Sequence, residues 1–332
     1  MLKAGILGAG HFGACHARAI ASIQGVRLTA VCDENAQLAH ALASHHGASV
    51  YDSWRDFLRI APVDVVVIAT PHHLHRDMAV EAAEAGKHIL LEKPMACTTA
   101  QCTEIISAAE RRSVKILVGH LLHFSLSGMV ARRIVDSGQL GRPIVGYSVL
   151  VKTWIESNRR SWHLNAATGG GMLMTAGIHV LDLLIWLMGA KVSTVSAAAA
   201  ACFHEQTADD TSMLLLRFAD GRLGQVTSIG YREGAGSYGA TLVCERGTLR
   251  VEFGQGVSIG KNGSWSVVPN SHEADWMQRA LEREWYALIK AISDNADVPV
   301  TGAYGRHVIA CIDAAMQSSR EGREVSVIHT FP

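Results

Sequence analysis

The 332-residue sequence is 48% hydrophobic and 18% charged, which is typical of a compact globular protein and excludes a largely disordered chain. Because one hydrophobic core rarely serves a chain of this length, we expect two domains. The 30 basic and 30 acidic side chains balance, which argues against binding to nucleic acid or to a membrane surface and favours a small-molecule partner.

Targeting and redox signals favour a soluble, cytoplasmic protein. The longest apolar run, residues 178–188, is interrupted by His179 and Asp182 and is too short to cross a bilayer. The N-terminus leads directly into a strand-like run at residues 4–7, so we expect no signal peptide. The seven cysteines are odd in number and form no Cys-x-x-Cys pair, which indicates reduced thiols rather than disulfides or a zinc knuckle.

Residues 2–119 alternate short apolar runs with amphipathic ones, the pattern of βα units around a parallel sheet. The predicted strands are residues 4–7, 27–32, 63–69, 88–91 and 115–118. The predicted helices are residues 13–22, 36–45, 74–85 and 99–112. We therefore expect a Rossmann domain over residues 1–122.

A glycine motif, Gly8-x-Gly10-x-x-Gly13, follows the first predicted strand and opens the first helix, with His11 and Phe12 before the last glycine. In this context Gly8 permits a tight turn, Gly10 lets the backbone approach a pyrophosphate, and Gly13 lets helix pack on strand. These five residues are predicted to bind a dinucleotide. The alternative is an ordinary glycine turn.

Asp33 ends the second predicted strand, about twenty residues further on, where an acid that binds the adenosine ribose is expected. Glu34 and Asn35 follow it, and neither would accommodate a 2′-phosphate, so NAD is favoured over NADP. Asp33 could also be a helix N-cap, a role compatible with ribose binding.

The segment after the third predicted strand contributes Thr70, Pro71, His72 and His75, which we expect beside the nicotinamide half of the cofactor. Neighbouring histidines on one turn do not converge by themselves, and no carboxylate or cysteine pattern completes a ligand set. We expect no metal site.

Glu92-Lys93-Pro94 lies at the carboxyl end of a predicted parallel strand, the sheet edge where open α/β folds bind ligands. Lys93 beside a nicotinamide could hold the reacting hydroxyl or share its proton. From these residues alone, a solvated lysine or an ion pair with Glu92 is an equally good interpretation.

The pattern changes after Gly119, and we place the second domain at residues 123–332. Its predicted helices are residues 129–137, 173–188, 275–295 and 304–319, and its first and last predicted strands are residues 144–151 and 324–327. Asp-Gly, Arg-Gly and Asn-Gly pairs at residues 220–221, 246–247 and 262–263 indicate hairpins of an antiparallel sheet. The second domain is therefore predicted to be α+β.

Two groups of polar residues in this domain are candidates for the site. Arg159 and Arg160, near Trp154 and Trp162, could clamp a carboxylate or hold hydroxyls, or could lie in a solvated loop.

The second group is Thr175, His179 and Asp182, which share one face of the apolar helix at residues 173–188. Polar residues on such a stripe either hydrogen-bond one another in a core or line a cavity, and the residues alone favour a position in the core. Asp182 could orient His179 by fixing its tautomer.

Together these motifs resemble the Gfo/Idh/MocA oxidoreductases, named for glucose-fructose oxidoreductase and inositol dehydrogenase. The resemblance covers essentially the whole chain, and rests on the glycine loop, residues 69–75, 85–88 and 92–94, residues 169–182 and the tail from Thr301. It implies a Rossmann domain followed by a C-terminal domain with a large, mostly antiparallel open sheet that commonly mediates dimers or tetramers.

The resemblance also implies hydride transfer to or from sugars, polyols, sugar acids or cyclic diols. Lys93 matches the catalytic lysine of the family and His179 its acid/base histidine, while Glu92 joins the expected cofactor contacts. The expected substrate-binding residues are Lys93, His120, His123, Trp154, Arg159, Arg160, Trp162 and His179.

Two positions depart from the family pattern. Thr175 stands where many members have an aspartate, and a hydroxyl cannot hold the negative charge that tunes the lysine and histidine. His123 stands where many members have arginine. Thr175 thus leaves a non-enzymatic NAD(H) sensor as one alternative. The resemblance itself implies another, an NAD-dependent glycosidase or lyase without net redox change, because some members of the family use tightly held NAD in that way.

Overall fold

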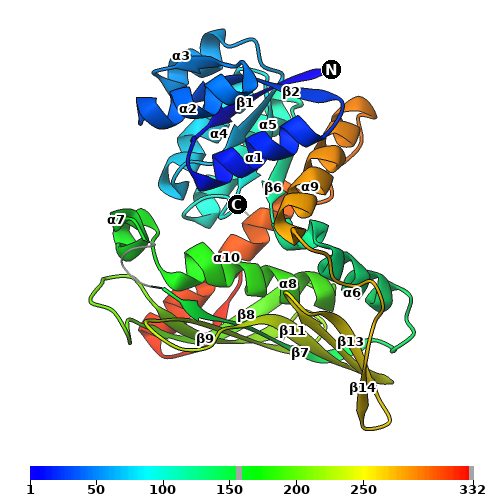
Figure 1. The fold of residues 1–332 in the computed structure, drawn as a ribbon. Coiled ribbons are helices and arrows are strands. Elements are labelled where there is room, and N and C mark those ends of the chain that lie inside the picture. Colours follow the sequence, from blue (N-terminus) through cyan, green and yellow to red (C-terminus); the bar gives the residue numbers. More distant parts are fainter. Residues whose placement is uncertain (155–158, 329–332) are drawn as a thin grey trace. The chain divides into compact units, whose positions relative to one another are not determined.

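The computed structural model describes residues 1–154 and 159–328 (Figure 1). The chain forms two compact units, one of Met1–Phe124 with Met277–Arg306, the other of Ser125–Trp276 with His307–Pro332. The sequence-based division, 1–122 and 123–332, differs in assigning all later residues to the second domain. Residues 277–306 lie with the first unit because helix α9 (Trp276–Ser293) buries Leu281 and Trp285 there.

The first unit is built on a sheet of six parallel strands among the described residues, in the order β3-β2-β1-β4-β5-β6. This is the strand order of a dinucleotide-binding Rossmann fold, so the predicted fold is confirmed. The strands are β1 (Leu2–Leu7), β2 (Val26–Cys32), β3 (Ser49–Tyr51), β4 (Val65–Ile68), β5 (His88–Glu92) and β6 (Ile116–Gly119).

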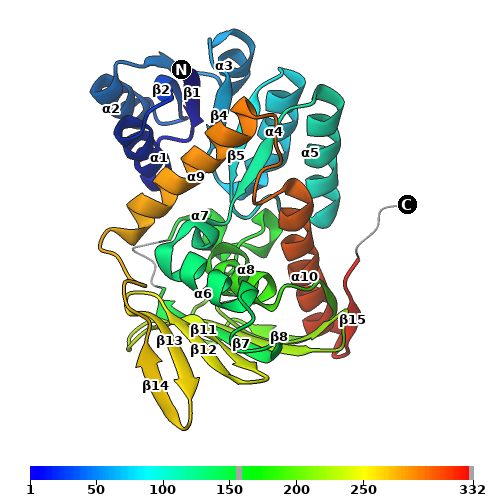
Figure 2. The same cartoon turned by 90° about the vertical axis from the view of Figure 1, so that its right-hand side faces the viewer.

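Helices cover both faces of this sheet, with α1 in contact with α2, and α4 in contact with α3 and α5 (Figures 1 and 2). They are α1 (His11–Ser22), α2 (Ala36–His46), α3 (Trp54–Ile60), α4 (His75–Glu84) and α5 (Thr99–Arg112), with short turns η1 (His72–Leu74) and η2 (Leu121–Phe124). Every residue of β4 is fully buried, and each such apolar side chain contributes about 1.5–3 kcal/mol.

One strand and one α-helix of this unit, β3 and α3, are missing from the sequence-based prediction. Strand β3 has three residues, too few to show a periodic pattern. Helix α3 has seven residues and is signalled mainly by its N-cap, because the Ser53 hydroxyl accepts a hydrogen bond from the N–H of Asp56.

The second unit is built on a sheet of nine strands among the described residues, ordered β14-β13-β12-β11-β7-β10-β9-β8-β15. All neighbouring pairs are antiparallel except β7 and β10, which confirms the mostly antiparallel sheet. The strands are β7 (Pro143–Thr153), β8 (Val192–Ala200), β9 (Thr211–Phe218), β10 (Leu223–Tyr231), β11 (Ser237–Cys244), β12 (Gly247–Glu252), β13 (Gly256–Lys261), β14 (Ser264–Val267) and β15 (Val325–Ser326).

One face of this sheet carries helices, with α8 (Ile178–Met188) against β7, β10 and β11, and α6 (Leu126–Asp136) against β12 and β13 (Figure 2). Helix α10 (Gly302–Glu321) starts in the first unit and reaches β8, where the Ser318 hydroxyl accepts the N–H of Ala197. Among the described residues of this unit are also α7 (Ser161–Leu164), η4 (Ala166–Thr168) and η5 (Leu173–Gly177).

The segment Ala166–Met188 is long and apolar enough, by length and composition, to cross a membrane. It is 78% buried inside the protein over its most apolar window, and α8 packs on the strands of the second unit. Its hydrophobicity is therefore that of a core helix.

Candidate functional site

The glycine loop turns between β1 and α1 at the carboxyl edge of the first unit's sheet. Gly8 has φ of 98°, and a Cβ there would lie 2.7 Å from the carbonyl group of Ala69 in the segment after β4. A Cβ on Gly13 would lie 1.9 Å from the carbonyl oxygen of Gly8. The fold itself therefore requires glycine at both positions.

Gly10 is different, because a Cβ there would meet no heavy atom of the described chain within 4 Å. Its backbone is extended, with φ of −68°, and it is the N-cap of α1, an end to which the described residues give no side-chain cap. Open space at a helix N-terminus suits a phosphate group. The residues present thus fit the pyrophosphate of a dinucleotide.

The two residues before Gly13 lie in the first turn of α1. His11 is exposed and Phe12 partly exposed, and their rings pack edge to face with centroids 5.6 Å apart. Their expected contact with the cofactor stays a prediction.

Asp33 follows β2 and is joined to the glycine loop. Its Oδ2 accepts the N–H of Ala9 at 2.6 Å, and its Oδ1 accepts the N–H of Asn35 at 2.8 Å. The N-cap of α2 is Asn35, which accepts the N–H of Leu38, so Asp33 does not cap this helix. Each carboxylate oxygen keeps a further lone pair, which is what binding both ribose hydroxyls requires.

The segment after β4 is tied to the segment after β5 by His75. Its Nδ1 lies 2.9 Å from the carbonyl oxygen of Pro94, and its Nε2 lies 2.9 Å from that of Thr70. Burial lowers the pKa of His75 in spite of these two carbonyls. His75 is 1% exposed, so its expected cofactor role, which stays a prediction, would be exerted through these two backbone segments.

The other expected residues of this segment are Thr70, Pro71 and His72. Thr70 and Pro71 are partly exposed, and the Thr70 hydroxyl donates to the sulfur of Met78 at 3.4 Å. His72 is 3% exposed.

Glu92 and Lys93 lie at the end of β5, and the Lys93–Pro94 peptide bond is cis. Glu92 is 7% exposed, and its Oε1 lies 2.9 Å from Nε2 of His16, a fully buried residue of α1. Its Oε2 accepts the N–H of Lys93 at 3.2 Å. Burial opposes ionisation of Glu92, but His16, by its hydrogen bond and by its charge when protonated, and Lys93, by its charge and its N–H, outweigh it and hold the Glu92 pKa below its usual range.

His120 and His123 pack with Tyr304, the third residue of α10. The centroid distances to the Tyr304 ring are 5.9 Å and 5.3 Å, and both histidines are at least nine-tenths buried. A role of the two histidines in substrate binding would involve this aromatic cluster, and Tyr304 is a residue that sequence reasoning missed.

In the second unit, the expected helix at residues 173–188 begins with a π turn, η5, before α8. The Thr175 hydroxyl donates to the carbonyl oxygen of Gly171 at 2.6 Å. His179 is partly exposed, whereas Asp182 is fully buried and lies close enough to Tyr238 to raise its pKa, after burial itself. The π turn changes the direction of Thr175 relative to the uniform α-helical register assumed from the sequence.

Asp209, which sequence reasoning also missed, holds the start of this π turn. Its Oδ2 accepts the N–H of Leu173 at 2.9 Å, and a Cβ on Gly171 would lie 2.2 Å from its Oδ1. Burial raises the pKa of Asp209 to about 6, with the neighbouring Asp210 adding to the effect. No spacing pattern in the sequence connects Asp209 to residues 171–173.

The aromatic and arginine cluster is only partly organised. Arg159 lies over the Trp154 ring at 5.7 Å and donates to the side chain of Gln206 at 2.5 Å. Arg160 is exposed, and Trp162 stacks on the adjacent His163 with centroids 3.6 Å apart. Arg159 is therefore fixed by its own unit, whereas the Arg160 side chain is open to solvent.

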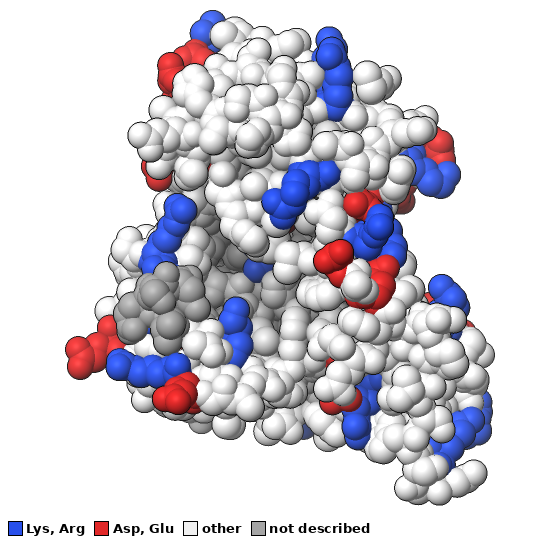
Figure 3. Space-filling view, in the orientation of Figure 1, with Lys and Arg blue, Asp and Glu red and all other residues white. Residues whose placement is uncertain are grey.

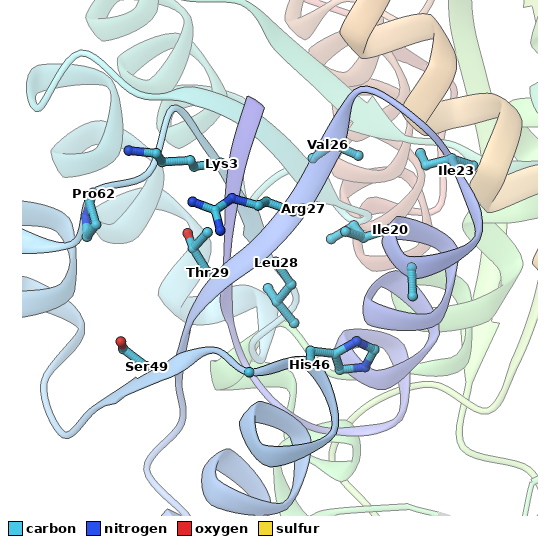
Figure 4. Close-up of a pocket in the computed structure, with 12 residues that line it drawn as sticks. Lys3, Ile20, Ile23, Val26, Arg27, Leu28, Thr29, His46, Ser49 and Pro62 are labelled. Carbon is cyan, nitrogen blue, oxygen red and sulfur yellow. The ribbon is translucent and has the colours of Figure 1, made fainter. Parts of the chain in front are cut away.

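A groove of about 500 Å³ in the first unit lies at the opposite edge of the sheet (Figure 4). It is lined by the first residues of β1, β2 and β3, among them Lys3, Arg27 and Ser49. The chemistry-bearing residues lie at the carboxyl edge, so we assign the groove no role. On the face drawn in Figure 3, basic and acidic side chains are interspersed over each unit, in keeping with a net charge of zero.

Comparisons with known proteins agree with this geometry. Residues 2–120 match the Gfo/Idh/MocA model described as an oxidoreductase family with an NAD-binding Rossmann fold, and residues 129–250 match the Gfo/Idh/MocA C-terminal domain. The uncharacterized oxidoreductase YrbE of Bacillus subtilis is 27% identical, over 98% of this chain and 96% of its own. The inositol 2-dehydrogenase of Rhizobium meliloti is also 27% identical, over 98% and 99%.

The solved structure of levoglucosan dehydrogenase in complex with NADH and levoglucosan superimposes with a TM-score of 0.89 at 22% identity, covering 98% of this chain and 99% of that one. At this identity the likeness shows a shared fold. The family models match both units, and the first unit has the strand order and glycine loop of a dinucleotide-binding domain. The chain therefore belongs to the Gfo/Idh/MocA family and is an oxidoreductase with an NAD-binding Rossmann fold.

Proposed function

We propose that the protein is a dehydrogenase that transfers a hydride between NAD and the hydroxyl- or carbonyl-bearing carbon of a small sugar, polyol, sugar acid or cyclic diol. One observation carries the proposal. The glycine loop, the Thr70 segment and Lys93 follow β1, β4 and β5, which are neighbouring strands of one parallel sheet. Their carboxyl ends form one edge, which in such folds is the ligand-binding edge.

Asp33 supports NAD rather than NADP. A hydrogen bond from the N–H of Ala9 holds its carboxylate beside the glycine loop. There the carboxylate would accept hydrogen bonds from both ribose hydroxyls and would repel a 2′-phosphate. An arginine or lysine at this position would favour NADP.

The bound nicotinamide supplies a hydride acceptor at C4 of its ring. The Lys93 ammonium donates a hydrogen bond to the reacting hydroxyl oxygen and stabilises the charge that develops there. The imidazole of His179 accepts the hydroxyl proton as the C–H bond gives up its hydride, so that a carbonyl group forms. These roles of Lys93 and His179 rest on their match to the family motifs.

Asp182 and Thr175 would support His179. Asp182 is buried one helical turn from His179 on α8, where a carboxylate could fix the imidazole tautomer. The Thr175 hydroxyl donates a hydrogen bond to the backbone carbonyl of Gly171 and carries no charge. We therefore assign no proton transfer to that position in this chain.

The substrate class is supported by the relatives, which include proteins named inositol 2-dehydrogenase and levoglucosan dehydrogenase. Arg159 and Arg160 would favour a carboxylated member of this class, such as a sugar acid. A cytoplasmic location stays a prediction.

We further propose that the second unit's sheet binds a second copy of the chain, giving a homodimer or homotetramer. Along β9 the buried Leu214 and Leu216 alternate with Met213 and Leu215, which are 52% and 62% exposed. Leu223 of β10 pairs across the sheet with Val145 of β7 and is also exposed. An apolar row of this kind on an open sheet face is typical of a protein–protein interface.

The function is tested by incubating the purified protein and NAD with a panel of polyols, sugars, sugar acids and cyclic diols, and following NADH. We expect NADH with at least one member, and less NADPH when NADP replaces NAD. Tight NAD binding without turnover across the panel would favour a sensor. A copurified, non-exchanging cofactor with bond cleavage would favour a lyase or glycosidase.

A further inference from the structure

A continuous chain of buried hydrogen bonds leads from α9 through α1 to the backbone of Lys93. The indole N–H of Trp285 donates to Nδ1 of His16 at 3.2 Å, and Nε2 of His16 lies 2.9 Å from Oε1 of Glu92. The other oxygen of Glu92 accepts the Lys93 N–H. His16 and Trp285 are fully buried, so water does not compete for these bonds.

The Trp285 indole, at the α9 end of this series of hydrogen bonds, determines which atom donates and which accepts in each bond. An indole nitrogen can only donate, so Nδ1 of His16 must accept. In the neutral imidazole the single proton is then on Nε2, where it points at the Glu92 carboxylate. Trp285 thus selects the His16 tautomer that stabilises a negative charge on Glu92.

The other titratable groups around Glu92 are poorly suited to holding its charge. Glu284, on α9, is fully buried, and neither of its carboxyl oxygens has a hydrogen-bond partner among the described residues. Burial, and then the charge of Glu92, raise the Glu284 pKa well above its usual range, which favours the neutral form of Glu284. Burial lowers the pKa of His75, on α4, which disfavours a second positive charge beside Glu92.

Glycine at position 119 of the neighbouring strand β6 makes room for the carboxylate, because a Cβ there would lie 3.2 Å from Oε2 of Glu92. The titratable groups facing Glu92 are His16, Lys93, Glu284 and His75, and Lys93 is the lysine among them, the side-chain type that is ordinarily a cation at neutral pH.

We propose that His16 and Trp285 are positioning residues that keep Glu92 ionised, and that the fixed charge of Glu92 in turn keeps Lys93 protonated and in place at the sheet edge. Whether these hydrogen bonds matter for turnover rests on the proposed catalytic role of Lys93. Their effect on the charge of Lys93 does not depend on that role. Neither His16 nor Trp285 need touch substrate or cofactor.

Removing the His16 donor to Glu92 should therefore change the titration of Lys93. In His16→Leu the buried carboxylate loses its hydrogen bond and tends to become neutral, so Lys93 loses its counter-charge. An opposite charge within 4–6 Å shifts a pKa by about 1–3 units, so we expect the apparent pKa of Lys93 to fall by about one unit.

The test is competitive trace acylation of the NAD-loaded protein across a pH series, with the peptide that carries Lys93 quantified by mass spectrometry. Acylation reports the free amine and needs no substrate. His16→Gln, whose side-chain amide can still donate to Glu92, should keep the wild-type titration. Glu284→Gln replaces one neutral group with another and should also keep it.

Unchanged Lys93 titration in a folded His16→Leu variant would overturn the proposal, as would a shift of the same size in Glu284→Gln. If His16→Leu does not fold, Trp285→Phe removes only the indole donor and should shift Lys93 in the same direction by a smaller amount; no shift there would also overturn it. If the Lys93 pKa falls as expected in His16→Leu but the protein turns over no substrate, the charge coupling is supported and the proposed dehydrogenase function is not.

Discussion

Oδ2 of Asp33 accepts a hydrogen bond from the N–H of Ala9 at 2.6 Å, which ties the end of β2 to the glycine loop after β1. The carboxylate thereby shapes the loop, and its proposed second role is to bind the adenosine ribose.

Asp33→Ala should weaken NAD binding by at least tenfold, because hydrogen bonds to a charged group contribute about 1.5–3 kcal/mol. The preference for NAD over NADP should shrink as well. Isothermal titration with both cofactors measures this, and Glu34→Ala, an exposed neighbour that loses the same charge, is the control. Equal effects in the two variants would argue against a ribose contact.

Gly10 and Gly13 should respond in opposite ways to substitution by alanine. Gly13→Ala would place a Cβ 1.9 Å from a carbonyl oxygen and should destabilise the protein by about 1–3 kcal/mol. Gly10→Ala meets no protein atom, so its free energy of unfolding should fall by no more than about 1 kcal/mol, the cost of alanine at an N-cap, while NAD affinity falls. Urea unfolding measures the effect on stability and cofactor titration the effect on NAD affinity. Unchanged NAD affinity in Gly10→Ala would contradict a pyrophosphate site at Gly10.

Asp209 should make stability depend on pH with a definite sign. Its folded pKa of about 6 lies above the ordinary 3.8, so the folded state holds a proton that the unfolded state has released. Its contribution is therefore lost as pH rises from about 4 to 6, by up to about 3 kcal/mol. Urea unfolding at several pH values should show a flatter profile for Asp209→Asn than for wild type.

The exposed Glu205, on the same segment, provides the control variant Glu205→Gln. A pH profile that is the same in wild type and in Asp209→Asn would show that Asp209 ionises normally in the folded protein.

Leu215→Glu should disrupt the proposed association through the sheet face, because it introduces a charge into an interface that would otherwise be apolar. Light scattering after size-exclusion chromatography should show a lower mass than for wild type. Ile60→Glu changes an exposed apolar residue of α3 and should leave the assembly intact. A wild-type monomer would contradict the proposed association.

The sequence predicted those parts of the fold that are written in local patterns. Strands such as β4 are continuous apolar runs, and the Asn262-Gly263 pair forms a hairpin turn with positive φ at both residues, as expected. The π turn at Leu173–Gly177 escaped prediction because it depends on Asp209, more than thirty residues away.

The candidate site was predictable where a motif adjoins a strand, as at Gly8 and Lys93. The support behind Lys93 was not, since His16 and Trp285 are 269 residues apart in the chain. One local signal was available. His16 lies between Gly13 and Ile20 on the buried face of α1, where a polar side chain needs a buried partner.

The central claim is that Lys93, at the carboxyl edge of the Rossmann sheet, serves hydride transfer with NAD. The most direct test is the kcat/KM for NADH formation by wild type, Lys93→Met and the control Lys191→Met, an exposed lysine, with NAD affinity measured in parallel. We expect Lys93→Met to lose about 10²–10⁴-fold in kcat/KM while still binding NAD, and Lys191→Met to match wild type. Wild-type activity in Lys93→Met would contradict the claim.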